Sequence, residues 1–539
     1  EDPQLAPHLA LMASAFAYHT DTHGEFVIQG GVRLVIDLYS RSPVEHVRLC
    51  CLLTILYLAE TPRARQSIAQ ERGLMMLLTA CENETHIDLV TNAMKAMIPF
   101  ASSDDFRPEL GLEGGMDTFA SFLFSDQITL QQLGCYLLQN LLELKANRRI
   151  FLGLAEEKKC EEDYLEPLTK FLPIVMKGPP KRIVRMKKPR KDGEDKEDSN
   201  LGPHDPFMLR TSIHCIALLS LEHNEEAKER FIELGIPTKF YDLFYSEQID
   251  KSSGEAVVLF FANCLHSSSM MQGRIMKGIE VIPLLLSAKE MEFSPHTNTR
   301  CLSALLSISR VPDFRRMVVG QLDLIMASVN SNLSSRERDE DFYATTAIHC
   351  ALLCELARAS TDFHEKMAKA GVVEAFLVFM TVAGRGVNDE MCIELLMSAV
   401  FGISALVSSP KTGEQCMTSL LFPATRLQLF MSLLRLPAQD INLIYHAGTI
   451  GLRALQRTAD PAITPEELQV GGLPLDEFME RCGVKPAAFV YRNVIRTLGL
   501  LLAHSEMAER VQQAIAAPRL VPTCLFALKD AEDTYVNVY

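Results

Sequence analysis

The chain has 539 residues, a formal net charge of −15, 48% apolar residues and no tryptophan. This length exceeds what one hydrophobic core supports, so we expect either several domains or one elongated array of repeats. The excess of acidic over basic residues repels phosphate backbones and therefore disfavours general nucleic-acid binding.

Two features bear on the compartment. The apolar stretch from Cys50 to Ala59 ends at Glu60 and Pro62, so it is too short for a membrane span, and the first residues lack the basic and apolar regions of a secretory signal. Fourteen cysteines are scattered along the chain, several in apolar segments, which indicates free thiols in a reducing compartment. These features predict a soluble, cytoplasmic protein.

One pattern recurs along most of the chain: a long apolar helix, a short polar break, a helix that carries Arg or Lys, and another apolar helix. Residues 49–60 form the first such long helix, residues 63–73 the basic helix, and residues 74–81 the helix that follows. Five further copies begin with long apolar segments at 133–144, 213–223, 257–267, 301–310 and 346–358. The sequence therefore predicts an all-α repeat protein with essentially no sheet.

Glycines before the last helix of each copy set the period. Gly31, Gly73 and Gly115 are 42 residues apart, and Gly235 and Gly278 are 43 apart. Armadillo and related repeats have periods of about 40 to 47 residues. Glycine tolerates the left-handed conformation in which a short helix can stop before the chain turns.

The pattern resembles the armadillo repeat family over roughly residues 24 to 460, and a degenerate copy follows near the C-terminal end. The family's glycine turn is matched at Gly30-Gly31-Val32, Gly114-Gly115-Met116, Gly235-Ile236-Pro237 and Gly371-Val372-Val373. The resemblance implies a right-handed α-α superhelical solenoid of armadillo-type repeats. It also implies that the third helix of each repeat lines a concave groove.

In that family the third helix often carries an asparagine that holds the backbone of an extended peptide. Asn140 and Asn263 match this position, and we expect both side chains to be solvent-facing or occupied by a partner. The absence of tryptophan excludes the Trp-Asn array of importin-α proteins.

The repeat pattern stops after Leu172. Residues 177–191 contain eight Lys or Arg, including Lys181, Arg182, Arg185, Lys187, Lys188, Arg190 and Lys191, and residues 192–198 contain five Asp or Glu. A solvated linker is one interpretation; contact with the acidic surface of a partner such as tubulin is another, and residues 187–191 also resemble a nuclear localisation signal. We expect N-terminal repeats over 1–175, an insert over 176–206, central repeats over 207–460 and an irregular segment with a helical cap over 461–539.

Signatures of catalysis are missing from the sequence. Gly384 to Asn388 lacks the strand and the Lys-Ser/Thr pair of a phosphate loop, and neither a Gly-x-Ser-x-Gly nor a His-Glu-x-x-His motif occurs. His349, Cys350 and Cys354 share a helix but lack a second ligand pair for zinc, so we expect core residues. We therefore predict that the chain is not an enzyme and holds no cofactor or metal ion.

Four tyrosines could anchor a partner or pack half-buried, and packing is favoured. They are Tyr136, Tyr241, Tyr245 and Tyr343.

The leading functional hypothesis is a non-catalytic protein-interaction scaffold that binds extended segments or helices. Its specific form is a structural component of a cytoskeletal assembly, ciliary or axonemal. The alternatives are an assembly chaperone for a cytoskeletal or motor client and the regulatory arm of an enzyme located elsewhere.

Overall fold

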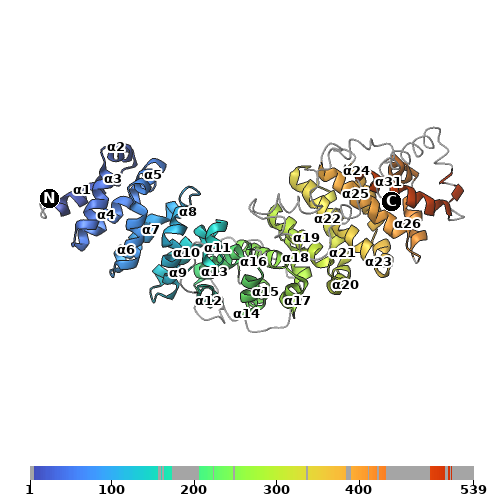
Figure 1. Cartoon of the computed structure of the whole chain (residues 1–539), viewed down its shortest axis with the longest axis horizontal. Helices are drawn as coiled ribbons and strands as arrows, with labels where there is room; N and C mark the ends of the chain where they lie inside the picture. Colours follow the sequence, from blue (N-terminus) through green and yellow to red (C-terminus); the bar gives the residue numbers. More distant parts are fainter. Residues whose placement is uncertain are drawn as a thin grey trace, which may run out of the picture. The chain divides into compact units, whose positions relative to one another are not determined.

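The computed structural model describes the chain at residues 5–155, 160, 163–172, 205–222, 224–246, 249–335, 338–383, 390–410, 412–421, 424–432, 486–503, 508–509 and 511–512. Regular structure within these ranges is helical throughout, and no strand occurs in them (Figure 1). This confirms the predicted all-α class.

Each repeat consists of a short first helix, a second helix and a long third helix. The first helices are α2 (His23–Ile28), α5 (Pro62–Gln70), α8 (Arg107–Leu110), α11 (Lys145–Phe151), α14 (Glu225–Glu233), α17 (Ser269–Met276), α20 (Pro312–Gly320), α23 (His364–Lys369) and α26 (Gly413–Leu421). The second helices are α3 (Gly31–Arg41), α6 (Gly73–Asn83), α9 (Met116–Ser121), α12 (Leu165–Lys170), α15 (Ile236–Tyr245), α18 (Val281–Glu290), α21 (Leu322–Leu333), α24 (Val372–Ala383) and α27 (Ala424–Ser432). The third helices are α4 (Glu45–Leu58), α7 (Ile87–Ala101), α10 (Ile128–Leu142), α13 (Pro206–Leu219), α16 (Lys251–Cys264), α19 (Pro295–Ser309), α22 (Glu340–Ala359), α25 (Glu390–Val407) and α31 (Pro486–Ala503).

The third helices pack on one another in rows. The chain divides into two compact units, unit 1 (Glu1–Phe260) and unit 2 (Phe261–Tyr539). In unit 1, α1 (Ala6–Ala17) packs on α4, α4 on α7, α7 on α10 and α10 on α13. In unit 2, α19 packs on α22, α22 on α25 and α25 on α31. Because α10 and α13 are direct neighbours, the predicted insert between them does not interrupt the row.

The glycine turns adopt the predicted left-handed conformation. Gly235, Gly278 and Gly371 have φ values of 68°, 76° and 80°, and each precedes a second helix or the turn that leads into one. L-residues with a side chain reach this region at a cost, which is why glycine stands there.

The turn before α6 departs from the prediction. Arg72, not Gly73, has the positive φ of 61°. Gly73 is required for space, because a Cβ there would lie 2.3 Å from Ile68 Cγ2 and 2.8 Å from the Ile68 carbonyl oxygen. The glycine signal in the sequence is therefore correct in its period, but at this repeat its cause is close packing.

Basic and polar side chains of the first helices cap the preceding third helices. Arg65 donates to Ala59 O at 2.8 Å, Arg107 to Ala101 O at 2.8 Å and Arg315 to Ser309 O at 2.8 Å. His23 and His364 form equivalent bonds with Ala17 O and Ala357 O, both at 2.7 Å. The last carbonyls of a helix lack intrahelical partners and carry partial negative charge, so a hydrogen-bond donor six or seven residues later stabilises that end.

Among the helices that the structure describes, none has both the length and the apolar character required to cross a bilayer.

Candidate partner-binding surface

The third helices of unit 1 present an exposed stripe on one side of their row. On α7 the exposed or half-buried positions follow intervals of four and three residues, and α10 repeats this spacing, so each helix turns one face outward. The α7 positions are Asp88, Asn92, Lys95, Pro99 and Ser102. The α10 positions are Thr129, Leu133, Tyr136, Asn140 and Glu143. We call these ten residues the unit 1 stripe.

Asn140 lies on this stripe and braces two helices. Ser102 Oγ donates to Asn140 Oδ1 at 3.2 Å, and Asn140 Nδ2 donates to the Tyr136 carbonyl oxygen at 2.8 Å. Ser102 directly follows α7 and Asn140 is near the end of α10, so the two helices run in the same direction. The Asn140 side chain is half-buried, as expected for a residue that a partner could reach.

Asn263 corrects the prediction that both asparagines face solvent. Its side chain is 0% exposed, and its Oδ1 accepts a hydrogen bond at 3.1 Å from Nε of Arg300, which is also fully buried. The hydrogen bond ties α16 to α19 inside unit 2. This bond gives a buried amide oxygen and a buried charged donor a partner each, so Asn263 acts as an internal brace.

The equivalent positions of α13, α19 and α22 are also internal. Ser220 is fully buried, and its hydroxyl donates to Ala217 O at 2.6 Å. Ser307 accepts from Gln272 Nε2 at 3.0 Å and donates to Leu265 O at 3.3 Å. Glu355 is 8% exposed and forms an ion pair with Arg358 at 2.7 Å. Tyr57 on α4 and Ala405 on α25 are half-buried like Asn140, but neither side chain is an amide that could bond a peptide backbone in the same way.

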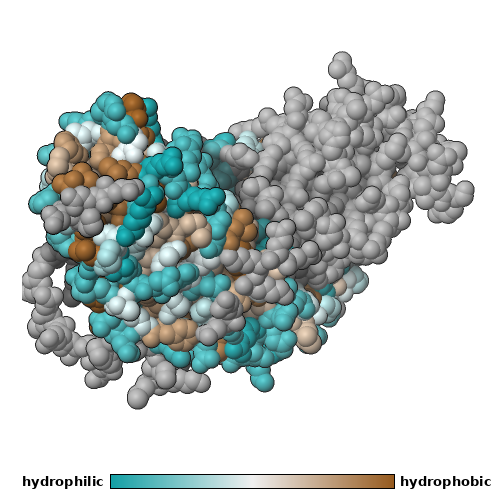
Figure 2. Space-filling model, turned by 60° about the vertical axis from the view of Figure 1, so that its left-hand side comes forward, coloured by the Kyte–Doolittle hydropathy of each residue, from teal (hydrophilic) through white to brown (hydrophobic). Residues whose placement is uncertain are grey.

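An apolar edge borders the stripe. Ile87 and Ile128, the first residues of α7 and α10, are exposed by 39% and 63%, and Phe207 at the start of α13 is 41% exposed. Figure 2 shows apolar patches among hydrophilic residues on the face of the molecule that it draws. Exposed apolar groups rimmed by polar ones are typical of protein-binding sites. We call Ile87, Ile128 and Phe207 the apolar edge.

The tyrosines pack half-buried, as predicted. The Tyr136 and Phe207 ring centroids are 6.3 Å apart, and those of Tyr241 and Tyr245 are 4.8 Å apart. Tyr343 lies against Phe342 at 5.3 Å. Tyr136 therefore links the stripe on α10 to the apolar edge on α13.

The predicted basic contact lies outside the described residues. This applies to Lys181, Arg182, Arg185, Lys187, Lys188, Arg190 and Lys191. Gly384 to Asn388 also lie outside the described residues.

His349, Cys350 and Cys354 are core residues, as predicted. Burial lowers the pKa of His349 to about 3 and raises that of the Cys354 thiol to about 12, so the imidazole is neutral and the thiol is protonated near neutral pH. In the described part of the chain, no three His, Cys, Asp or Glu side chains form a group that could hold a metal ion.

The sequence interpretation missed Asn92, Lys95 and Ser102. They stand at intervals of four and three residues with Asp88 and Pro99, so a polar periodicity within the third helix is the signal that identifies them. The apolar edge was also missed, because an isoleucine at the start of an apolar helix looks like a core residue.

No protein-family model matches the chain, and no curated protein sequence matches it. Solved structures do. An engineered protein from the Northeast Structural Genomics Consortium overlays with a TM-score of 0.59 at 15% identity, covering 87% of this chain and 97% of that one. A structure from a study of a phosphorylation switch that controls the interaction between cadherin and beta-catenin overlays with a TM-score of 0.57 at 15% identity. The overlay covers 99% of this chain and 96% of that one.

A designed armadillo repeat protein also matches, at 13% identity, over 51% of this chain and 98% of its own; its TM-score of 0.38 is too low to add weight. The fold assignment depends on the two longer overlays, on the repeat of three helices and on the period of about 42 residues. The chain is an α-solenoid of the armadillo-repeat type.

Proposed function

We propose that the chain is a protein-interaction scaffold and that its partner binds across the unit 1 stripe and the apolar edge. The observation that carries this proposal is the exposure of one polar face on α7 and α10 beside three exposed apolar side chains. Repeat proteins commonly bind extended partners along such surfaces. The described residues offer no comparable open face at the equivalent third-helix positions of α16 and α19, which are buried.

Asn140 would hold the partner backbone. A primary amide has two N–H groups and an oxygen with two lone pairs, of which Tyr136 O takes one N–H and Ser102 one lone pair. The remaining N–H and lone pair match the carbonyl and amide of one peptide unit. The apolar edge would accept apolar side chains of the same segment, since burial of such groups supplies most of the binding energy.

The test compares partner recovery by matched variants of the full chain. Tagged wild type, the double variant Ile87→Ser/Ile128→Ser and Asn140→Ala are purified gently from native cells, and the recovered proteins are quantified. Met75→Ser and Gln70→Ala are the controls, because Met75 on α6 is 40% exposed, Gln70 is an exposed amide on α5, and neither belongs to the stripe or the apolar edge. A partner that the stripe variants lose and the controls keep supports the proposal. Equal recovery by all five chains would disprove it.

We further propose that the partner belongs to a cytoskeletal assembly, ciliary or axonemal. The support is the repeat array, its acidic charge and the basic run over 177–191, which suits an acidic surface such as tubulin. Co-sedimentation with microtubules tests this proposal, with Lys187→Gln/Lys188→Gln/Arg190→Gln/Lys191→Gln as the variant. Binding that is weakened by the variant supports it. If the proteins recovered with the chain are transiently bound, unfolded clients, they would instead indicate a chaperone. A stably bound enzyme would indicate a regulatory arm.

A further inference from the structure

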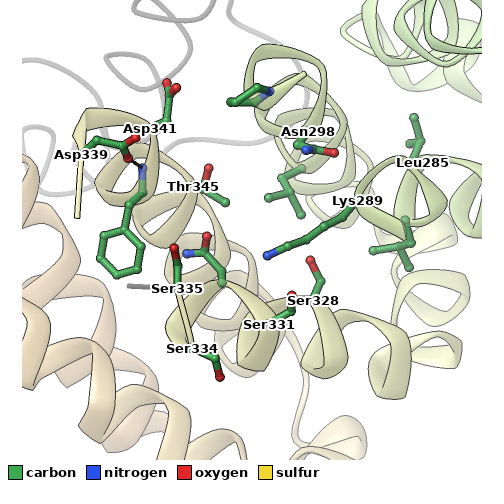
Figure 3. Close-up of a pocket in the computed structure, with 15 residues that line it drawn as sticks. Leu285, Lys289, Asn298, Ser328, Ser331, Ser334, Ser335, Asp339, Asp341 and Thr345 are labelled. Atoms are coloured by element: carbon green, nitrogen blue, oxygen red, sulfur yellow. Dashed lines mark hydrogen bonds between the residues drawn. The ribbon is translucent and has the colours of Figure 1, made fainter. Parts of the chain in front are cut away.

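A cavity of about 370 Å³, lined by both apolar and polar side chains, lies within unit 2, between α18, α19, α21 and α22 (Figure 3). Its lining includes Lys289 from α18, Asn298 from α19, Ser328 and Ser331 from α21, and Thr345 from α22. Cavities that bind small ligands or single side chains have volumes of about 300 to 1,000 Å³. This cavity belongs to a different unit from the stripe, so what it binds is independent of the function proposed above.

Lys289 is the cation of the cavity. Its side chain extends from α18 into the space between the helices, with the amino end toward Ser328 and Ser331 (Figure 3). In the part of the chain that the structure describes, it forms no ion pair with a carboxylate. Burial lowers the pKa of Lys289, because the ammonium has lost part of its hydration. A bound anion would restore favourable interactions to this charge.

Hydroxyl groups surround the space next to Lys289. The Ser328 hydroxyl and His349 Nε2 are 3.1 Å apart. The buried imidazole has its pKa lowered, first by burial and then by the Lys289 charge, so it contributes no second positive charge. Ser331, three residues further along α21, adds another hydroxyl to the lining. The site thus combines one cation with neutral hydrogen-bond donors.

Two carboxylates stand where α22 begins, at the edge of the cavity (Figure 3). Asp339 Oδ1 accepts from the Phe342 backbone N–H at 2.9 Å and so caps α22, while Asp341 is exposed. Their negative charges oppose entry of a dianion more strongly than entry of a monoanion, because Coulomb repulsion grows with the charge of the ligand.

We propose that this cavity binds a single carboxylate group, with the carboxylate against Lys289 and the hydroxyls of Ser328 and Ser331. The carboxylate comes either from a free organic acid or from an acidic side chain of a bound protein. Inorganic phosphate fits less well, because most of it is doubly charged near pH 8 and the cavity has one cation facing two acidic groups.

The experiment measures the rate at which an amine-reactive ester acylates Lys289 in the full chain at pH 8, followed by mass spectrometry. The probes are butyrate, a monocarboxylate, for the free acid, the α-amide of N-acetylglutamate for a protein side chain, and inorganic phosphate. A bound carboxylate raises the pKa of Lys289, and each unit gained lowers its neutral, reactive fraction about tenfold. Lys239 is the matched control, because it lies in unit 1 and burial lowers its pKa in the same direction.

Butyrate or the α-amide of N-acetylglutamate is expected to slow acylation of Lys289 and leave acylation of Lys239 unchanged. The probe that protects Lys289 more strongly identifies the source of the carboxylate. Ser331→Ala should reduce the protection, and Asp341→Asn should let phosphate protect as well. Both side chains are exposed, so these variants are expected to fold. Equal protection of Lys239, or phosphate protection of wild-type Lys289 as strong as that by butyrate, would overturn the proposal.

Discussion

Arg148 and Glu222 form a buried ion pair that joins two repeats of unit 1. Arg148 Nε donates to Glu222 Oε1 at 2.8 Å, and the two side chains are 2% and 4% exposed. The same guanidinium donates through Nη1 to Leu142 O at 3.1 Å and Glu143 O at 2.9 Å. One arginine therefore caps α10 and pairs with the carboxylate that follows α13, so the two neighbouring third helices are connected through it.

Glu222→Gln should destabilise unit 1 by about 3 to 5 kcal/mol, because it removes the negative charge of Glu222 from beside a buried guanidinium. Urea unfolding followed by circular dichroism measures the loss. Glu233→Gln is the control, since Glu233 pairs with Arg230 at 3.0 Å on the surface, where both side chains are more than two-fifths exposed. Exposed pairs contribute about 0 to 1 kcal/mol, so similar losses for the two variants would contradict the assigned role of Glu222.

Gly235→Val should destabilise unit 1 by about 1 kcal/mol or more, because valine is strained at a φ of 68°. Gly278→Val and Gly371→Val should have similar effects in unit 2. Gly320→Ala is the contrasting case: no atom lies within 4 Å of the added Cβ, and alanine is the better helix former at the end of α20. Thermal unfolding distinguishes the two classes, and neutral valine variants would contradict the register of the turns.

The fold could be predicted because its signals are local and repeated. The period of the glycines and the Arg or Lys in the first helices each have a direct physical cause, as Gly235 and the capping bond of Arg65 show. Each signal is weak by itself, but several that recur at one spacing are specific for a repeat architecture. Arg72 could not be predicted to take the left-handed position, because the neighbouring glycine offered the simpler explanation.

The candidate site was harder to predict, since helical position alone does not determine burial. Asn140 and Asn263 occupy the same place in their third helices, yet one reaches Ser102 on the surface and the other meets Arg300 in the interior. The difference depends on Arg300, which lies 37 positions after Asn263. The pattern of residues within a single helix cannot show how Arg300 packs against it. The Lys289 cavity is likewise formed by four helices, none of which carries a motif.

Asn263→Ala should destabilise unit 2 by about 1 to 3 kcal/mol, because Arg300 Nε loses its acceptor in the interior. Asn140→Ala should change stability by less than about 1 kcal/mol, since Ser102 and its surroundings are accessible to water. Denaturant unfolding of both single variants measures the contrast. An Asn140 variant that unfolds as readily as the Asn263 variant would mean that Asn140 is mainly a brace.

Stability should decrease as the pH is lowered, partly because of His349. Burial lowers its pKa in the folded chain to about 3, whereas in the unfolded chain an imidazole titrates near 6.5. Between these values the unfolded state binds more protons, so the free energy of unfolding rises with pH; the stability that the neutral imidazole contributes is present above about pH 6.5 and is lost progressively as the pH falls toward 3.

His349→Gln keeps a polar group near Ser328 and removes the titration, so its free energy of unfolding should depend less on pH than that of the wild type between pH 6.5 and the lowest pH at which unit 2 remains folded. Denaturant unfolding at a series of pH values measures this slope, and the difference between the two chains cancels the contribution of the carboxylates. His8→Gln is the control, because His8 is exposed on α1. Parallel pH profiles for wild type and His349→Gln would show that the pKa of His349 is the same in the folded and unfolded states. That result would contradict its assignment as a buried neutral group.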